Sequence, residues 1–296
     1  MIRLLLLTAL IIVGCACSRT DLAYRNADRL LSYYAWKTVD PTPAQRDQWQ
    51  PVLEDTIQQH RREELPQVIA YLELAGRIIR EEDASGGTAC LVDTAQLLYQ
   101  RHARLAADLS APLLADLDAA QVRHLDRYTS KRRKDAIERY LDPDPARRKA
   151  SRQERIMERI EDWTGDLDKS QRQQVSEALE RIPDLSEPWL SYRAQQTAKL
   201  LGMLEAGSDE KTVREHLDGW WVDQEDRSDE YQRQWRIARH EFIRFMDELG
   251  TTLTEKQRRS IQKRLAELRE ELAGFLSPAQ QPVSMPMVPA CMFKPV

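Results

Sequence analysis

The chain has 296 residues with 44 basic and 48 acidic side chains, and its formal net charge of −4 argues against nucleic acid as a partner. Only 10 glycines are present and runs of β-branched residues are few, which leaves little material for strands and tight turns. We therefore expect an all-α fold, a multi-helix bundle with antiparallel helical hairpins.

The first fifteen residues predict where the protein works. Arg3 precedes a predominantly apolar run, residues 4–13, that is too short to span a membrane and has the length of a signal-peptide core. The ending Ile-Val-Gly-Cys at Cys15 resembles the lipobox of bacterial lipoproteins. That resemblance implies that residues 1–14 are a signal peptide and that Cys15 is lipidated. Because Ala16 follows, where enteric inner-membrane lipoproteins carry aspartate, we expect an outer-membrane lipoprotein with its body in the periplasm.

The first half of the chain predicts three helical stretches. The first carries one apolar stripe and ends before Pro41, which disfavours helix at the preceding residue. The second spans residues 43–82, with a bend or break expected at Pro51 or Pro66. After a loop at 83–88, a third helix places His102 on its buried face, and the chain turns near residues 110–117. The stripe of the first helix contains Ala23, Ala27, Leu30, Leu31 and Tyr34.

The second half predicts helices at 118–141, 146–163, 169–181 and 189–206, and another that ends near Trp221. The last two helices have the most regular apolar spacing, and a short turn joins them. We expect an antiparallel hairpin in which Phe242 faces Leu265 or Leu268. The hairpin stripes consist of Trp235, Ala238, Phe242, Phe245 and Leu249 on one helix, and of Ile261, Leu265, Leu268 and Leu272 on the other.

Composition also suggests how the chain is divided. A proline-containing segment near 183 separates an N-terminal helical region, 15–182, from a C-terminal one, 183–276, although the two could form one continuous domain. Residues 277–296 contain five prolines and no periodicity, so we expect a disordered tail.

Four helix starts share one pattern, a Thr or Asp followed three residues later by Gln. Such pairs form capping boxes, in which each side chain bonds the other residue's backbone N–H, and each cap contributes on the order of 1 kcal/mol. The last copy, LTEKQR at 253, is similar to the LTxxQ motif of Spy-type periplasmic chaperones, helical cradles that hold unfolded clients. Capping alone also accounts for the pattern. The predicted pairs are Thr42 with Gln45, Asp118 with Gln121, Asp168 with Gln171, and Thr254 with Gln257.

A broader resemblance follows the lipobox through LAYRNADRLL, VDPTPAQR and HRREELP. Over roughly the first 70 residues the chain is similar to an uncharacterised family of bacterial lipoproteins, a domain of unknown function. Pro41 departs from the leucine that the family pattern favours before the capping threonine. The resemblance implies a lipoprotein and assigns no activity.

No catalytic, metal or cofactor site is predicted. His60 and Glu64 have the i, i+4 spacing of helical metal ligands, but Arg61 and Arg62 would repel a cation, so a surface ion pair is favoured. Cysteines occur at 15, 17, 90 and 291. A bridge between Cys90 and Cys291 is conceivable, but with Cys15 lipidated one thiol would be left over, and we expect no bridge.

Two features are candidates for an interaction surface. Residues 123–155 carry twelve basic and six acidic side chains, including Lys131, Arg132, Arg133 and Lys134, which could face anionic headgroups, an acidic partner or solvent. Trp220 and Trp221 are about 100° apart on a helix, so one is expected at an interface unless a groove between helices buries both.

Three classes of function are compatible with these features. We favour a non-catalytic scaffold or adaptor, anchored in the membrane through Cys15, that binds an envelope protein. The alternative is a chaperone-like protein that holds unfolded envelope proteins. The third class is a cell-wall enzyme, and the expected compartment is its only support.

Overall fold

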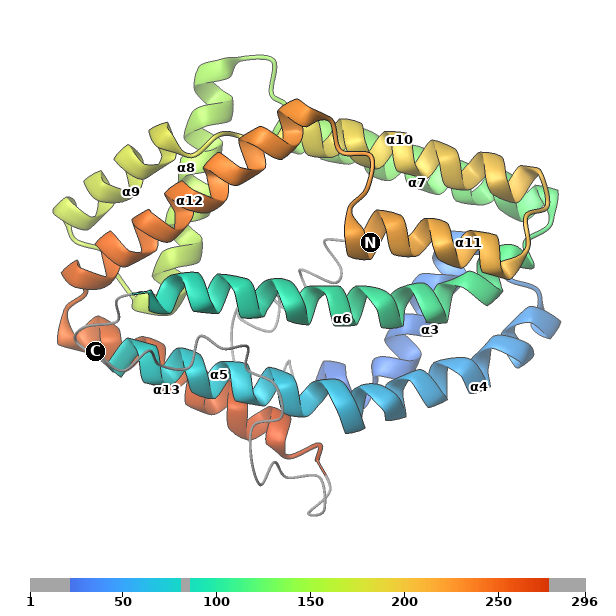
Figure 1. Cartoon of the computed structure of the whole chain (residues 1–296), viewed down its shortest axis with the longest axis horizontal. Coiled ribbons are helices and arrows are strands. Elements are labelled where there is room, and N and C mark those ends of the chain that lie inside the picture. Colours follow the sequence, from blue (N-terminus) through green and yellow to red (C-terminus); the bar gives the residue numbers. More distant parts are fainter. Residues whose placement is uncertain (1–21, 81–85, 277–296) are drawn as a thin grey trace. The chain divides into compact units, whose positions relative to one another are not determined.

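The computed structural model describes residues 22–80 and 86–276, and this part of the chain consists of helices and connections without a strand (Figure 1). The predicted all-α class is therefore confirmed. The predicted signal peptide, Cys15 and the predicted disordered tail, residues 277–296, lie outside the described residues. The helices are α3 (Ala27–Val39), α4 (Pro43–Gln59), the π-helix η1 (His60–Glu64), α5 (Leu65–Arg80), α6 (Gly87–Ala115), α7 (Ala119–Tyr140), α8 (Pro145–Thr164), α9 (Lys169–Arg181), α10 (Ser186–Glu205), α11 (Glu210–Leu217), the π-helix η2 (Asp218–Asp223), α12 (Asp229–Thr252) and α13 (Glu255–Ala273).

The chain forms two compact units, each assembled from three separate segments. One switch between the units, at residues 186 and 187, lies close to the boundary near 183 that the composition suggests. The switches between residues 64 and 65 and between 98 and 99 fall inside continuous helical stretches, where composition gives no signal, and the other two fall in the connections after α7 and after η2. Unit 1 comprises the described residues within Met1–Glu64, Tyr99–Leu141 and Glu187–Arg227, and unit 2 comprises those within Leu65–Leu98, Asp142–Ser186 and Ser228–Val296.

All four capping boxes are present, at the starts of α4, α7, α9 and α13. In unit 1 the backbone N–H of Thr42 donates to Gln45 Oε1 over 2.9 Å, and the N–H of Gln45 donates back to Thr42 Oγ1 over 3.3 Å. The caps satisfy amides that a helix start leaves without intrahelical partners.

The capping glutamines also pair with each other across each unit. In unit 2, Gln171 Nε2 and Gln257 Nε2 each donate to the other's Oε1 over 2.9 Å. Gln171 Nε2 further donates to the carbonyl of Thr252, and Gln257 Nε2 to that of Asp166, each over 2.9 Å. Each amide thus uses both N–H donors and both lone pairs of its oxygen. The two polar side chains are therefore buried with all their hydrogen-bonding groups satisfied.

Unit 1 repeats this arrangement with different residues. Gln45 and Gln121 exchange hydrogen bonds of 3.2 and 2.7 Å, and they donate to the carbonyls of Asp116 and Asp40. In each case the acceptor carbonyl lies two residues before the partner's N-cap. We call each arrangement a glutamine pair, and each joins two helix starts that are far apart in sequence.

Breaking a glutamine pair is expected to destabilise its unit. Gln171→Leu leaves the Thr252 carbonyl and part of the Gln257 amide without partners, so we predict a loss of about 1–3 kcal/mol in the free energy of unfolding. Chemical denaturation followed by circular dichroism measures it. Gln173→Leu, at an exposed position of the same helix, is the control, and equal losses in the two variants would contradict the role of the pair.

The prolines affect the helices differently from expectation. Pro51 lies inside α4 and Pro112 inside α6, so the turn expected at 110–117 begins only after Ala115. The indole N–H of Trp49 donates to the carbonyl of Leu109 over 2.8 Å, in the turn before Pro112. Pro66 is the second residue of α5, one residue after η1, and the wider π-turn there relieves the crowding that a proline ring imposes on the preceding turn.

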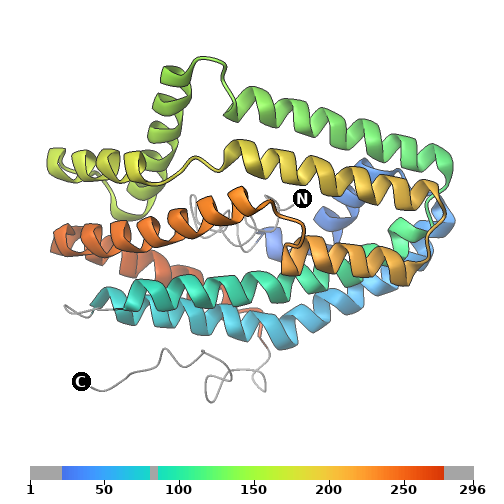
Figure 2. The same cartoon turned by 45° about the horizontal axis from the view of Figure 1, so that its top comes forward.

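Unit 2 packs its last two helices differently from the predicted hairpin. The main contacts of α12 are with α9, and those of α13 are with α5 and α8; Figures 1 and 2 both show α9 beside α12. A buried cluster joins Phe245 and Leu249 of α12 to Met157, Leu167, Val175 and Ala178. Phe242 is 42% exposed, so its expected place in the core is wrong, because the helix turns Phe245 and Leu249 inward instead.

Two further expectations are corrected. In the first helical stretch Ala23, Leu30 and Tyr34 are exposed, because the buried side of α3 is rotated toward residues such as Val39. Cys90 takes part in a disulfide, against the expectation of no bridge, and the other three cysteines lie outside the described residues. Across residues 22–80 and 86–276, no helix is long and apolar enough to cross a membrane.

Candidate functional site

A polar cluster surrounds η1 in unit 1. His60 lies at the start of this π-helix, where Tyr24 Oη is 2.9 Å from its Nδ1 and His102 Nε2 of α6 is 3.2 Å from its Nε2. Sequence alone gave His60 no second histidine nearby, because 42 residues separate it from His102. The helices bring the two rings together in a T-shaped contact with centroids 5.2 Å apart.

Glu64 does not pair with His60, contrary to the predicted surface ion pair. Its buried carboxylate accepts two hydrogen bonds from Arg101, each of 2.6 Å, one from Nε and one from a terminal nitrogen. This bidentate geometry makes the contact strong and fixes its orientation. The ion pair therefore ties η1 to α6.

The electrostatics of the cluster keep His60 uncharged. Burial, assisted by the neighbouring His102 and Arg61, lowers the pKa of His60 from 6.5 to about 3. Burial also raises the pKa of Tyr24 to about 12. Neither group exchanges its proton near neutral pH, which general acid or base catalysis would require. Among the residues that the structure describes, no group of three or more His, Cys, Asp or Glu could hold a metal ion.

We predict that His60 makes folding sensitive to acid. Below pH 6.5 the unfolded chain binds a proton at His60, while the folded protein does so only near pH 3. Stability therefore falls on acidification through this window, by at most about 1.4 kcal/mol per pH unit. His60→Asn should flatten the fall between pH 6.5 and 4, measured by denaturation at several pH values. His240→Asn, at an exposed site, should leave it unchanged, and an unchanged slope in His60→Asn would refute the assignment.

The second π-helix, η2, buries both predicted interface tryptophans. Trp220 and Trp221 are buried in unit 1, so neither provides the exposed face that an interaction surface needs. Tyr192 Oη donates to the Trp220 carbonyl over 3.3 Å, and Tyr99 Oη to the Trp221 carbonyl over 2.8 Å. The wide π-turn allows both rings to be buried, which the 100° rule for an α-helix does not anticipate.

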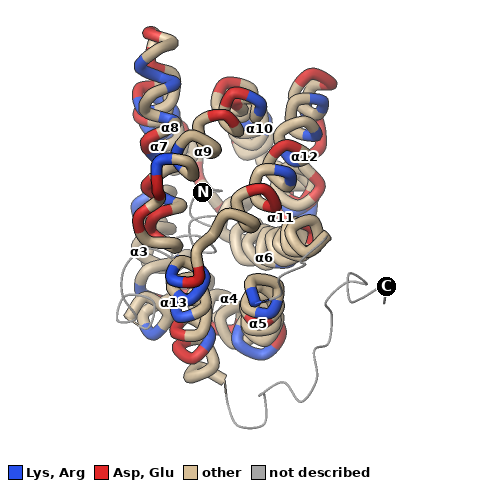
Figure 3. The backbone as a smooth tube through the Cα atoms, turned by 90° about the vertical axis from the view of Figure 1, so that its left-hand side faces the viewer, with Lys and Arg blue, Asp and Glu red and all other residues tan. Residues whose placement is uncertain are grey.

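The predicted basic surface is exposed. Lys131, Arg132, Arg133 and Lys134 lie in the exposed middle of α7, and Lys134 Nζ is 3.9 Å from Glu138 Oε1. Burial, with repulsion from Arg132, lowers the pKa of Arg193 on α10. Positive charge is thus concentrated here, whereas on α5 and α13 basic and acidic residues are interspersed (Figure 3).

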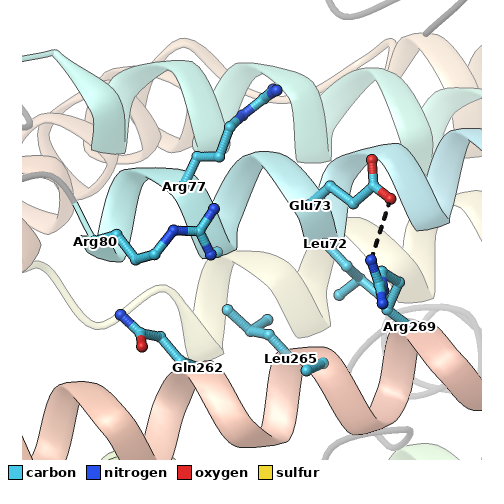
Figure 4. Close-up of a pocket in the computed structure, with 9 residues that line it drawn as sticks. Leu72, Glu73, Arg77, Arg80, Gln262, Leu265 and Arg269 are labelled. Atoms are coloured by element: carbon cyan, nitrogen blue, oxygen red, sulfur yellow. Dashed lines mark ion pairs between the residues drawn. The ribbon is translucent and has the colours of Figure 1, made fainter. Parts of the chain in front are cut away.

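A pocket of about 330 Å³ opens between α5 and α13 in unit 2. Leu72 and Leu265 provide apolar lining, and Glu73 forms an ion pair of 3.6 Å with Arg269 (Figure 4). Arg80 and Gln262 extend into the gap between the helices. Three arginines and one glutamate line the pocket, so it would attract a small anion such as a carboxylate. No sequence pattern indicates this pocket, because its two helices are far apart in the chain.

An exposed row of large apolar residues lies on α12, the helix whose apolar stripe the sequence analysis expected to be buried. Trp235, Phe242 and Met246 are spaced seven and four residues apart, which puts them on one side of the helix. Their exposed fractions are 38, 42 and 36%. Arg239 lies on the same side and forms an ion pair with Asp93 of α6. We call Trp235, Phe242 and Met246 the α12 row.

The fold and these sites define an all-helical protein of two units, and in each unit a glutamine pair joins two helix starts. The chain belongs to a family of unknown function, DUF6279, whose pattern matches residues 37–232. The match extends well beyond residue 70, but it begins at residue 37, so the lipobox and LAYRNADRLL, on which the resemblance also rested, lie outside it. No curated protein and no solved structure matches the chain.

Proposed function

We propose that the protein is a lipid-anchored, non-catalytic scaffold of the bacterial envelope. The lipobox-like residues before Cys15 support the anchor, and Ala16 supports the outer membrane as its location. The body that the anchor holds is built from helices joined by buried glutamine pairs. Such a body suits the presentation of a fixed surface to a partner.

The observation that carries the binding proposal is the α12 row. Trp, Phe and Met are enriched at protein interfaces, and here they share one side of a helix with an arginine. The sequence spacing of these residues is that of a buried stripe, yet more than a third of the surface of each residue is exposed to water. A folded envelope protein that packs on the row would bury this surface.

The anchor is tested by Cys15→Ala. A lipid acceptor is needed for stable attachment, because each buried methylene of an acyl chain contributes about 0.8 kcal/mol and more than one chain is required. We expect the variant to accumulate as an unprocessed precursor without fatty-acid label. A variant that is still labelled and cleaved would assign the acceptor to Cys17.

The scaffold is tested by photocrosslinking in cells from position 242. We expect one discrete adduct with a folded protein, lost when Trp235 and Met246 are changed to Ser. Position 237, occupied by an isoleucine that is 45% exposed on another side of α12, is the matched control. Equal adducts from both positions would contradict a binding role of the row.

The second candidate, a chaperone that holds unfolded proteins, is favoured by the same row, since exposed apolar side chains beside charge are what such a protein offers. It predicts many adducts from position 242. It also predicts that the purified protein suppresses light scattering by an unrelated denatured protein at equimolar ratio, at low and high salt. The scaffold proposal predicts no suppression.

A further inference from the structure

The outer side of α3 carries an exposed combination of apolar, aromatic and basic residues. Residues 22–25 are helical and α3 follows after one turn residue. The exposed positions form two neighbouring rows with helical spacing, 22, 29 and 33, and 30, 34 and 37. We define the α3 outer face as Leu22, Arg29, Leu30, Tyr33, Tyr34 and Lys37.

The opposite side of this segment fixes it to unit 1. Trp36 packs against Trp49 of α4 with ring centroids 5.4 Å apart, and the guanidinium of Arg46 lies 5.2 Å from the Trp36 ring. The carbonyl of Lys37 is 3.2 Å from His124 Nε2 of α7. The α3 outer face (blue helix in Figure 1) is therefore held in one orientation on its unit.

The chemistry of this face matches a lipid headgroup layer. Among the exposed residues from 22 to 37 several are basic and none is acidic. Tyr33 is 56% exposed, and Lys37 Nζ lies 5.8 Å from the centre of its ring. Tyrosines place an apolar ring in the boundary and a hydroxyl in water, and basic side chains beside them are attracted to anionic headgroups.

The length of the connection to the lipid acceptor makes the contact possible. Leu22 lies seven positions after Cys15, and at about 3.5 Å per residue this connection spans at most about 25 Å. We propose that the α3 outer face lies on the headgroups of the membrane that holds the lipid. This rests on the proposed anchor at Cys15. The face then fixes how unit 1 is oriented at the membrane.

The experiment places a photoreactive benzoylphenylalanine at position 33 of the full lipidated protein in vesicles of phosphatidylethanolamine with about 30% phosphatidylglycerol. We expect crosslinked lipid from position 33 at a yield several-fold above that from position 52, where the exposed Val52 of α4 serves as the matched control. Changing Arg29 and Lys37 to Glu should lower the yield from position 33 several-fold, whereas Arg62→Glu, at an exposed position of η1, should not. Thermal unfolding checks that each variant is folded.

Equal yields from positions 33 and 52, or no effect of the charge reversals, would overturn the proposal. Fatty-acid labelling of the same sample tests the anchor separately. A labelled protein without a crosslink from position 33 disproves the contact and keeps the anchor. If the label is absent, the anchor fails, and crosslinking after addition of the protein to preformed vesicles still decides whether the α3 outer face binds lipid.

Discussion

Changing Arg101 to Ala is expected to lower the free energy of unfolding by about 3–5 kcal/mol, because it leaves the carboxylate of Glu64 buried without a counterion. The side chain of Glu64 is 5% exposed and that of Arg101 36%, so the carboxylate has little access to water once the guanidinium is gone. Chemical denaturation of the purified protein measures the loss.

Two variants separate this cause from a general effect of losing an arginine. Replacing both partners, Arg101→Met with Glu64→Leu, removes the buried charge as well and should recover most of the stability. Arg62→Ala, at an exposed position of η1, should change stability by less than about 0.5 kcal/mol. If the double variant were as unstable as Arg101→Ala, the loss would come from packing of the long side chain instead.

The local part of the fold could be predicted from the sequence. A Thr or Asp three residues before Gln acts through its own backbone, so all four capping boxes occur where the pattern places them. The glutamine pairs could not be predicted in this way, because Gln171 and Gln257 are 86 residues apart and only tertiary structure joins them.

The cluster around η1 shows the same limit. The spacing of His60 and Glu64 indicated a contact between them, but that argument assumes an α-helix and ignores what packs against it. Each residue has a better partner on α6, His102 for the imidazole and Arg101 for the carboxylate. Two adjacent residues of one helix thus satisfy two residues of another, which helical spacing within one segment does not reveal.

The α12 row shows that apolar periodicity does not determine which residues of a stripe are buried. Five apolar residues at helical spacing predicted one buried stripe, yet the helix buries Ala238, Phe245 and Leu249 and leaves Trp235 and Phe242 along the flank. A helix of 3.6 residues per turn spreads such a stripe over a broad arc, and its partner covers only part of that arc. Which part of the arc is covered depends on where α9 packs, and the spacing of apolar residues on α12 does not show this.

Phe245→Ala should cost about 3–5 kcal/mol, whereas Phe242→Ala, three residues away on the same helix, should cost at most about 1.5 kcal/mol. Phe245 is 4% exposed in the cluster with Val175 and Leu249, so truncation leaves a cavity there. Phe242 already has 42% of its surface in water, and its loss removes less apolar burial.

The two variants delete the same atoms from one helix, so helix propensity and denatured-state effects cancel in the comparison. Chemical denaturation gives both values under identical conditions. Equal costs would mean that Phe242 is core after all, and the α12 row would then lose its role as a binding surface. A large cost at Phe245 with a small one at Phe242 would leave binding of a partner as the reason for an aromatic side chain at position 242.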